Sequence, residues 1–202
     1  MTSQEKNFVV GFDMDGVIID HTENKLVLAR RHGITLRPEE THSEIIAKRI
    51  PVDVYLSFQD EIYGDSEFAL SAPLMEGAFA TLRQLNEEGV PFVLISRRRK
   101  PMNAIKLLTG HGLWGKIFDE TNTLFGETNA VFVRTAEEKN TAAMAWNITH
   151  YIDDERKVLE KMPSVPSRFL FDAFQQFADE KQFPRVFNWE MLYEALVHAR
   201  SR

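Results

Sequence analysis

Short apolar runs rich in β-branched and aromatic residues recur along the chain, with helix-like stretches between them. The runs cover residues 8–12, 90–95, 130–133, 148–152 and 168–171. Continuous apolar runs of this length are typical of strands that are buried on both faces, as in a parallel sheet. Strands that alternate with helices in this way predict an α/β fold with a doubly wound, mainly parallel, Rossmann-like sheet.

Three amphipathic helices are expected between and after these strands. Their apolar residues recur at spacings of three and four, as on one face of a helix. Gly89 follows the first helix as a stop signal, and Pro101 opens the second one. The apolar stripes consist of Ala78, Phe79, Leu82 and Leu85 in the first helix, Met102, Ile105 and Leu108 in the second, and Trp189, Leu192, Tyr193, Leu196 and Val197 in the third.

The segment from Thr22 to Pro73 breaks the alternation, because no run in it has the pattern of a buried strand. Glycine and proline residues divide it into helix-like stretches, at Gly33, Pro38, Pro51 and Gly64. We therefore predict a small all-helical cap, residues 21–73, inserted after the first strand of an α/β core formed by residues 1–20 and 74–202.

The chain has 202 residues, of which 44% are apolar, enough for the packed core of one α/β domain with a small insert. The net charge of −6 and the pI near 5.6 argue against a broad basic surface for duplex nucleic acid. The chain has no cysteine, which excludes disulfide bonds and thiolate chemistry. The apolar runs are too short for a signal peptide or a membrane span, so we expect a soluble cytoplasmic protein.

Two pairs of carboxylates follow strands that are far apart in the sequence. Asp13 and Asp15 end the first strand, where Gly16 allows a sharp turn, and Asp153 and Asp154 end a later one. Either pair alone is commonly a solvated turn or a helix cap, but both stand at the edge where open α/β sheets bind ligands. Four carboxylates there would repel one another unless a cation lay among them, and all-oxygen ligands favour Mg²⁺.

Two further strand ends carry residues suited to binding a phosphate. Ser96 ends the run at 90–95, and its hydroxyl and the backbone N–H that follows it are hydrogen-bond donors. Arg134 and Lys139 follow the run at 130–133, and a cation there can offset charge on a phosphoryl group. Taken alone, Ser96 would be an ordinary turn residue and Lys139 a solvated helix lysine.

The order of these motifs resembles the haloacid dehalogenase (HAD) superfamily of phosphohydrolases. The resemblance spans most of the chain outside the segment 21–73. It rests on Asp13-Met14-Asp15-Gly16-Val17, on Ser96, on Lys139, on the pair Asp153-Asp154, and on Pro73-Leu74-Met75-Glu76-Gly77, which looks like the return from cap to core.

The resemblance implies that Asp13 attacks phosphorus to form an aspartyl-phosphate, and that Asp15 protonates the leaving oxygen and then activates water. It also implies a Mg²⁺ ion held by the Asp13 carboxylate, the Asp15 backbone carbonyl and one carboxylate of the final pair. We favour Asp154 as that ligand, with Asp153 one layer behind it. The phosphoryl group would be bound by Ser96, Arg97 and Lys139.

Lys139 lies 14 residues before Asp153, a shorter interval than in many relatives, so a nearby arginine is an alternative for its role. The alternatives are Arg97, Arg98 and Arg134. The basic run 97–100 either raises the local concentration of anions over the site or is an exposed loop.

In the family, a helical insert at this position closes over the substrate, and residues 22–73 occupy the same position here. The aromatic residues of the insert either stack on a substrate base or form the insert's own core, which is the interpretation we favour: Tyr55, Phe58, Tyr63 and Phe68. Its basic residues are expected on a solvated face: Arg30, Arg31, Lys48 and Arg49. The six histidines show no metal-binding spacing and receive no role.

We therefore predict a Mg²⁺-dependent phosphatase that hydrolyses a small phosphomonoester. Residues 13–17 and 152–154 are also similar to the small 5′-deoxyribonucleotidases, although phosphoglycolate-like and sugar phosphatases share much of this pattern. A phosphomutase, a non-catalytic binding module and a flavodoxin-like phosphoacceptor are alternatives. Asp15 argues against a dehalogenase, which lacks an acid at that position. The oligomeric state stays open.

Overall fold

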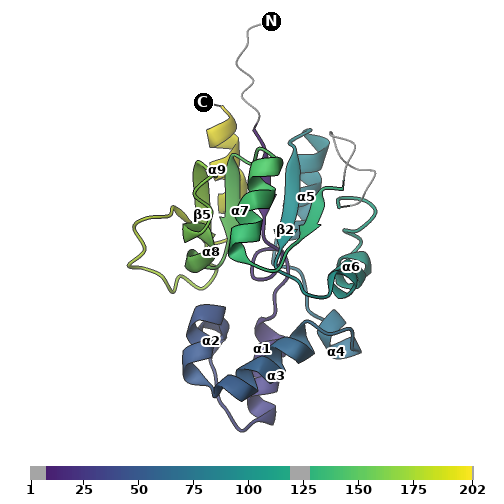
Figure 1. The fold of residues 1–202 in the computed structure, drawn as a ribbon, viewed down its shortest axis with the longest axis vertical. Coiled ribbons are helices and arrows are strands. Elements are labelled where there is room, and N and C mark those ends of the chain that lie inside the picture. The colour runs from purple at the N-terminus through teal and green to yellow at the C-terminus, as the bar shows by residue number, and fades with distance from the viewer. Residues whose placement is uncertain (1–7, 119–127, 202) are drawn as a thin grey trace, which may run out of the picture.

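A computed structural model describes residues 8–118 and 128–201, which form an α/β structure with one central sheet (Figure 1). In this part of the chain the sheet has six strands in the order β3-β2-β1-β4-β5-β6, and every neighbouring pair is parallel. The strands are β1 (Val10–Phe12), β2 (Phe92–Ser96), β3 (Ala130–Phe132), β4 (His150–Asp153), β5 (Ser167–Phe171) and β6 (Arg185–Val186). The predicted parallel, doubly wound sheet is confirmed, and the short β6 is an addition that no apolar run indicated. Residues 1–7, 119–127 and 202 of the predicted core lie outside the described residues.

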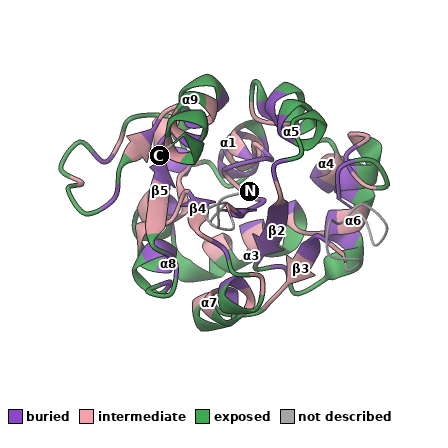
Figure 2. Ribbon diagram, turned by 90° about the horizontal axis from the view of Figure 1, so that it is seen from above, coloured by how far each residue is buried: buried purple, intermediate pink, exposed green. Residues whose placement is uncertain are grey.

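Helices cover both faces of the sheet (Figure 2). One face is covered by α5 (Ala78–Glu87), α6 (Pro101–Gly110) and α9 (Trp189–Arg200), and the other by α7 (Ala136–Ala145) and α8 (Arg156–Glu160). In β2, for example, Leu94 packs in the cluster under α5, α6 and α9, whereas Val93 and Ile95 pack in the cluster under α7 and α8. Because both faces are buried, every position of such a strand is apolar, and the strands read as continuous apolar runs.

Three residues of the predicted apolar stripes lie exposed. Phe79, Met102 and Val197 are 37%, 64% and 41% exposed, whereas Leu82 and Leu108 on the same helices are buried. Each of these helices packs on the sheet with one side only, so positions at the margin of the stripe reach solvent. The pattern predicts the helices correctly but includes these three residues wrongly in the buried side.

Residues 22–70, all of them described, contain helices as their only regular elements. These are α1 (Thr22–Arg31), η1 (Pro38–Thr41), α2 (Ser43–Arg49), α3 (Val52–Ile62) and α4 (Glu67–Leu70). Figure 1 shows this helical segment beyond the carboxyl ends of the strands, on the side away from the end of α9. Phe58 is buried in a hydrophobic cluster of the segment itself, and Tyr55, Tyr63 and Phe68 pack against that cluster. The favoured interpretation, a core of their own, is therefore confirmed for Tyr55, Phe58 and Phe68, whereas Tyr63 packs against this core and also lines a pocket.

Two antiparallel stretches of chain join the helical segment to the sheet. Ile19 pairs with Leu74, and the Asp20 N–H donates a hydrogen bond to the Pro73 carbonyl at 2.8 Å. The chain thus leaves the sheet and returns to it at the same place, next to the end of β1. No helix in the described ranges is both long enough and apolar enough to cross a membrane.

Candidate active site at the carboxyl edge of the sheet

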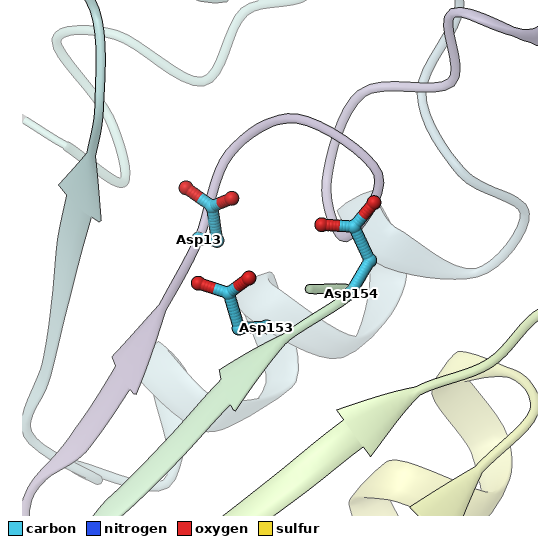
Figure 3. Close-up of side chains that lie close together, drawn as sticks. All are labelled: Asp13, Asp153 and Asp154. Carbon is cyan, nitrogen blue, oxygen red and sulfur yellow. The ribbon is translucent and has the colours of Figure 1, made fainter. Parts of the chain in front are cut away.

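Three aspartates meet at the carboxyl ends of β1 and β4, where the strand order reverses (Figure 3). Phe12 lies opposite Ile152 in the register of these two strands, so Asp13 and Asp153 leave the sheet side by side. One carboxylate oxygen from each of Asp13, Asp153 and Asp154 lies within 4.8 Å of the others. Open α/β sheets bind ligands at such a reversal, because the adjacent connections leave to opposite faces and open a crevice.

Gly16 shapes the loop between β1 and the helical segment. Its φ of 84° lies in the left-handed region, and its N–H donates to the Ile19 carbonyl at 2.9 Å. A Cβ at this position would collide with Oδ2 of Asp154. Glycine is therefore required both for the backbone conformation and to leave room for the Asp154 carboxylate.

Lys139 is a fully buried cation between two of the aspartates. Its Nζ lies 2.8 Å from Oδ1 of Asp13 and 2.7 Å from Oδ2 of Asp153. The short interval between Lys139 and Asp153 fits this arrangement, because α7, which carries Lys139, is followed directly by β4, which ends at Asp153. Of the alternatives considered for this role, Arg134 is exposed, and its side chain forms no ion pair with a described carboxylate. Lys139 itself is buried behind Asp13 and is not among the residues that line the pocket.

The adjacent residues Asp153 and Asp154 have different surroundings. Both oxygens of Asp153 are engaged, Oδ2 by Lys139 and Oδ1 by the Glu155 N–H at 2.9 Å. The Asp154 side chain is 15% exposed and lines the pocket, and Nε2 of His42 lies 3.5 Å from its Oδ2. Asp154 therefore has the freer carboxylate of the two.

The cluster is electrostatically unfavourable without a bound cation. Burial, with the charges of Asp153 and Asp15, raises the pKa of Asp13 to about 7 against the opposing charge of Lys139. Burial and the neighbouring carboxylates also raise the pKa of Asp154 well above its ordinary value. A divalent cation among these oxygens would restore their ionised forms, and a donor set made of carboxylates fits a hard ion. The cluster can therefore hold a divalent metal.

Asp15 lies in the same loop but has partners of its own, the cation Arg98 and the ring of His21. Arg98 donates to Oδ2 through Nε at 2.8 Å and to Oδ1 through Nη2 at 2.6 Å, and Nε2 of His21 lies 2.8 Å from Oδ1. Burial raises the pKa of Asp15, but the charge of Arg98 and the contact with His21 outweigh it, and the pKa is well below its ordinary value. The Asp15 side chain is thus held as a carboxylate.

The residues expected to bind phosphate stand at the same edge. Ser96 ends β2, the neighbour of β1, and its Oγ is buried without a hydrogen-bond partner among the described residues. A buried hydroxyl normally has a partner, so an unpaired one here is suited to a ligand oxygen. Arg97 lines the pocket and forms an ion pair with Glu155 at 2.6 Å.

The helical segment forms the wall of the pocket that faces the aspartates. It contributes Lys25, His42 and Tyr63 among its lining residues. His42 also contacts the core directly, because its Nε2 lies 2.9 Å from the carbonyl oxygen of Asp154 and its ring lies 4.9 Å from that of Phe177. The helical segment therefore reaches the candidate metal-binding residues themselves.

Three residues contact the aspartates of the site although the sequence did not predict these contacts: His21, His42 and Arg98. The spacing of the histidines excludes a metal site but gives no information on a hydrogen bond to a carboxylate. His21 follows Asp15 by six residues in the loop after β1, which is the only signal in the sequence for that contact. Arg98 is 4% exposed, so the interpretation of residues 97–100 as an exposed basic loop is wrong at this position.

No protein-family model and no curated protein matches this sequence. Solved structures with the same fold include a predicted phosphatase from Clostridium acetobutylicum, which is 13% identical. The two structures have a TM-score of 0.64 over 95% of this chain and 99% of the other.

Two further solved structures share the fold over nearly the whole chain. A HAD hydrolase from Entamoeba histolytica is 13% identical, with a TM-score of 0.61 over 96% of this chain and 100% of that one. A HAD family hydrolase from Deinococcus radiodurans, with bound phosphate and sodium, is 19% identical, with a TM-score of 0.58 over 96% and 97%. The fold is therefore that of HAD-superfamily hydrolases, which confirms the fold that the sequence resemblance implies.

Proposed function

We propose that this protein is a Mg²⁺-dependent phosphatase of small phosphomonoesters and that Asp13 is its nucleophile. The observation that carries the proposal is the cluster of Asp13, Asp153 and Asp154 with Lys139 buried against it. Carboxylates and a cation in this arrangement suit phosphoryl transfer, in which catalysis consists mainly of positioning and charge stabilisation. The fold shared with HAD-superfamily hydrolases supports the proposal by analogy alone.

Three groups would hold the Mg²⁺ ion: the carboxylates of Asp13 and Asp154 and the backbone carbonyl of Asp15. When bound, the ion supplies positive charge for the oxygens of the phosphoryl group. Asp154 is the better ligand of its pair because both oxygens of Asp153 are already engaged. Asp153 instead fixes Lys139, and through it the orientation of Asp13.

The reaction follows in two steps. An oxygen of Asp13 attacks phosphorus, the bond between phosphorus and the ester oxygen breaks, and the alcohol leaves after it takes up one proton. Water then attacks the phosphorus of the aspartyl-phosphate, gives one proton to a base, and releases inorganic phosphate and free Asp13. Lys139 favours the ionised form of Asp13 that the attack requires, and Ser96 and Arg97 bind the phosphoryl oxygens.

Asp15 donates and accepts the proton in this scheme. Its contacts with Arg98 and His21 keep it ionised, which suits the base of the second step. As the acid of the first step it must carry a proton, and this requires that Arg98 release at least one of its two hydrogen bonds. Tyr63 of the helical segment lies over Arg98, with the guanidinium carbon 4.3 Å from the ring centroid, so movement of that segment is a route to the release.

We also propose that residues 21–73 act as a cap over a core of residues 1–20 and 74–202. Two observations support a body that moves as a unit. The helical segment has its own hydrophobic cluster, and its two chain connections to the sheet lie side by side, where Ile19 pairs with Leu74. Such a cap would enclose the leaving group between the helical segment and the aspartates.

The proposal is tested by measuring phosphate release from an aryl phosphate with Mg²⁺ and with chelator, for the wild type and for Asp13→Asn. Turnover that requires the metal and is lost in Asp13→Asn supports both the reaction and the nucleophile. Activity that persists in Asp13→Asn, after mass spectrometry has excluded hydrolysis of the amide back to Asp, would contradict the mechanism. A single equivalent of phosphate bound to Asp13 without turnover would indicate a phosphoacceptor instead.

A further inference from the structure

Lys25 is a cation of the pocket for which the described part of the chain provides no ion-pair partner. It lies near the start of α1, and its side chain lines the same pocket as Asp13 and Asp154. No carboxylate oxygen of residues 8–118 and 128–201 lies within 4.0 Å of its ammonium group. A charged group beside the aspartates therefore remains available to a ligand.

The carboxylates of this pocket mostly have other partners. Four of them form ion pairs of 2.6 to 3.0 Å: Asp13 with Lys139, Asp15 with Arg98, Glu155 with Arg97, and Asp172 with Arg185. Asp20 accepts a hydrogen bond from the Thr22 N–H at 2.8 Å, and Asp154 is the proposed ligand of the metal. Once Mg²⁺ is bound, Lys25 is left facing the pocket without an anion from the described part of the protein.

The fold holds Lys25 in this position although it is half-buried. Helix α1 begins directly after the loop of the aspartates, and the Lys25 N–H donates to the His21 carbonyl at 3.0 Å. Leu28 and Ala29 of the same helix are buried in the hydrophobic cluster of the helical segment, which holds the helix in place. Burial lowers the pKa of Lys25, while the charges of Asp154 and Asp15 oppose this effect. A half-buried ammonium without a contact partner is unfavourable, and an anionic ligand would remove that cost.

Lys25 lies on the opposite wall from the groups expected to bind the transferred phosphoryl group. Ser96 and Lys139 belong to the sheet and to α7, whereas Lys25 belongs to the helical segment, as do the lining residues Thr41 and Ser43. The wall that faces the nucleophile is the one that meets the leaving group of a bound ester. An anion at Lys25 would therefore belong to the leaving group and not to the phosphoryl group.

On the basis of the proposed phosphatase function, we infer that Lys25 is a specificity-determining residue that binds a second anionic group on the leaving group of the substrate. That group is a carboxylate or a phosphate. The substrate is then a small phosphorylated acid or a bisphosphate, in preference to the phosphate ester of a neutral alcohol.

Three substrates separate these possibilities. Ethyl phosphate has a neutral leaving group, phosphoglycolate adds a carboxylate, and ethylene glycol bisphosphate adds a phosphate. Their kcat/KM values with Mg²⁺ are compared for the wild type, for Lys25→Met, which removes the charge and keeps the length, and for Lys25→Arg, which keeps the charge. Lys48→Met, at an exposed lysine of α2, is the control for loss of a surface charge.

We expect Lys25→Met to lower the kcat/KM ratio of one anionic substrate to ethyl phosphate by about 10- to 100-fold, mainly through KM, as for the loss of one charge-assisted hydrogen bond. Lys25→Arg should retain most of the ratio, and Lys48→Met all of it. The anionic substrate with the larger loss identifies the carboxylate or the phosphate as the group that is recognised. Equal losses for all three substrates, or an unchanged ratio, would overturn the inference.

Failure of the proposed function gives a different result. In that case the wild type hydrolyses none of the three compounds, and calorimetric binding of the same compounds replaces turnover as the measurement. Binding of an anionic compound that is at least about tenfold tighter than that of ethyl phosphate, and that is lost in Lys25→Met, would still support the role of Lys25. Equal binding of all three compounds to the wild type would overturn it.

Discussion

Asp13 and Asp15 lie two residues apart in one loop, and their surroundings are opposite in charge. Asp13 faces two further carboxylates and shares the cation Lys139 with one of them, whereas Asp15 receives two hydrogen bonds from Arg98 and a contact from His21. Burial raises the pKa of both carboxyl groups. At Asp15 the charge of Arg98 outweighs burial and the pKa is lowered, whereas the pKa of Asp13 rises to about 7.

This difference is the reverse of what the first step of the proposed reaction requires, since a nucleophile must be ionised and an acid must carry a proton. A cation among the three aspartates would correct the first half by lowering the pKa of Asp13. Release of Arg98 would correct the second half by allowing Asp15 to bind a proton. Two residues of one type in one loop are thus suited to different roles by partners from distant parts of the chain.

The largest effect is expected when Lys139, the cation that Asp13 shares with Asp153, is removed. Lys139→Met leaves two buried carboxylates facing each other, so we expect phosphate release to fall at least about 1,000-fold. We expect the free energy of unfolding to fall by about 3–5 kcal/mol, as for a broken buried ion pair. Initial rates and urea unfolding measure the two effects.

The matched control for Lys139 is Lys161→Met. Lys161 is exposed, and its ion pair with Glu137 spans 3.5 Å, so neither quantity should change appreciably. A Lys139→Met protein that is destabilised but fully active once folded would show that this lysine is structural and has no part in the reaction.

A smaller effect is expected when a side chain is added at Gly16, in the loop after β1, where it meets the Asp154 carboxylate. Gly16→Ala places a methyl group against the Asp154 carboxylate, so we expect the Mg²⁺ affinity measured by calorimetry to fall by about 10- to 100-fold. Gly33→Ala is the control, because Gly33 also has a positive φ, of 70°, but a Cβ there meets open space. It should lose about 1 kcal/mol of stability from backbone strain and keep its Mg²⁺ affinity. Equal affinities in the two variants would refute the role of Gly16 in making room for Asp154.

Removal of the two hydrogen bonds that Arg98 donates to Asp15 tests why the pKa of Asp15 is low. In Arg98→Gln the pKa of Asp15 should rise toward its ordinary value, so hydrolysis of an alkyl phosphate should improve severalfold relative to an aryl phosphate, whose leaving group needs no acid. The free energy of unfolding should fall by about 2 kcal/mol, less than for a fully buried pair because the Asp15 side chain is 17% exposed. Arg98→Lys keeps the charge but cannot form both hydrogen bonds, so it should lie between the wild type and Arg98→Gln. An unchanged ratio of the two substrates in Arg98→Gln would argue against control of the proton by Arg98.

The last effect needs no substitution and concerns pH and the raised pKa of Asp13. Mg²⁺ binds the ionised carboxylate, so with a pKa of about 7 its affinity should be about tenfold weaker near pH 6 than near pH 8. A second consequence concerns stability when a chelator keeps the metal site empty. The Asp13 carboxyl group then keeps its proton in the folded protein up to a pH of about 7, whereas in the unfolded chain it releases the proton near pH 4. Asp13 therefore makes the free energy of unfolding fall as the pH rises from about 4 to about 7. Calorimetry and urea unfolding across this range measure both slopes, and Asp13→Asn should remove the contribution of this residue. A Mg²⁺ affinity that does not depend on pH would contradict the raised pKa.

The sequence by itself was enough for the parallel sheet and for the edge of it that carries the site. Strands buried on both faces must be continuous apolar runs, and parallel strands end at one edge, so Asp13, Ser96 and Asp153 were predicted there from the residues that precede them. The helical segment was recognisable because its apolar residues follow no strand period. The two-residue β6 was missed because it is too short to have a pattern.

Only the tertiary structure decided which partner each carboxylate has. Arg98 meets Asp15 across 83 residues of chain and His42 meets Asp154 across 112, and local periodicity carries no information on such contacts. The direction of a side chain depends on the packing of its helix or loop against the others. For the same reason the sequence could not show that Lys25 faces the aspartates without an ion-pair partner from residues 8–118 and 128–201, since that depends on how the helical segment lies over the sheet.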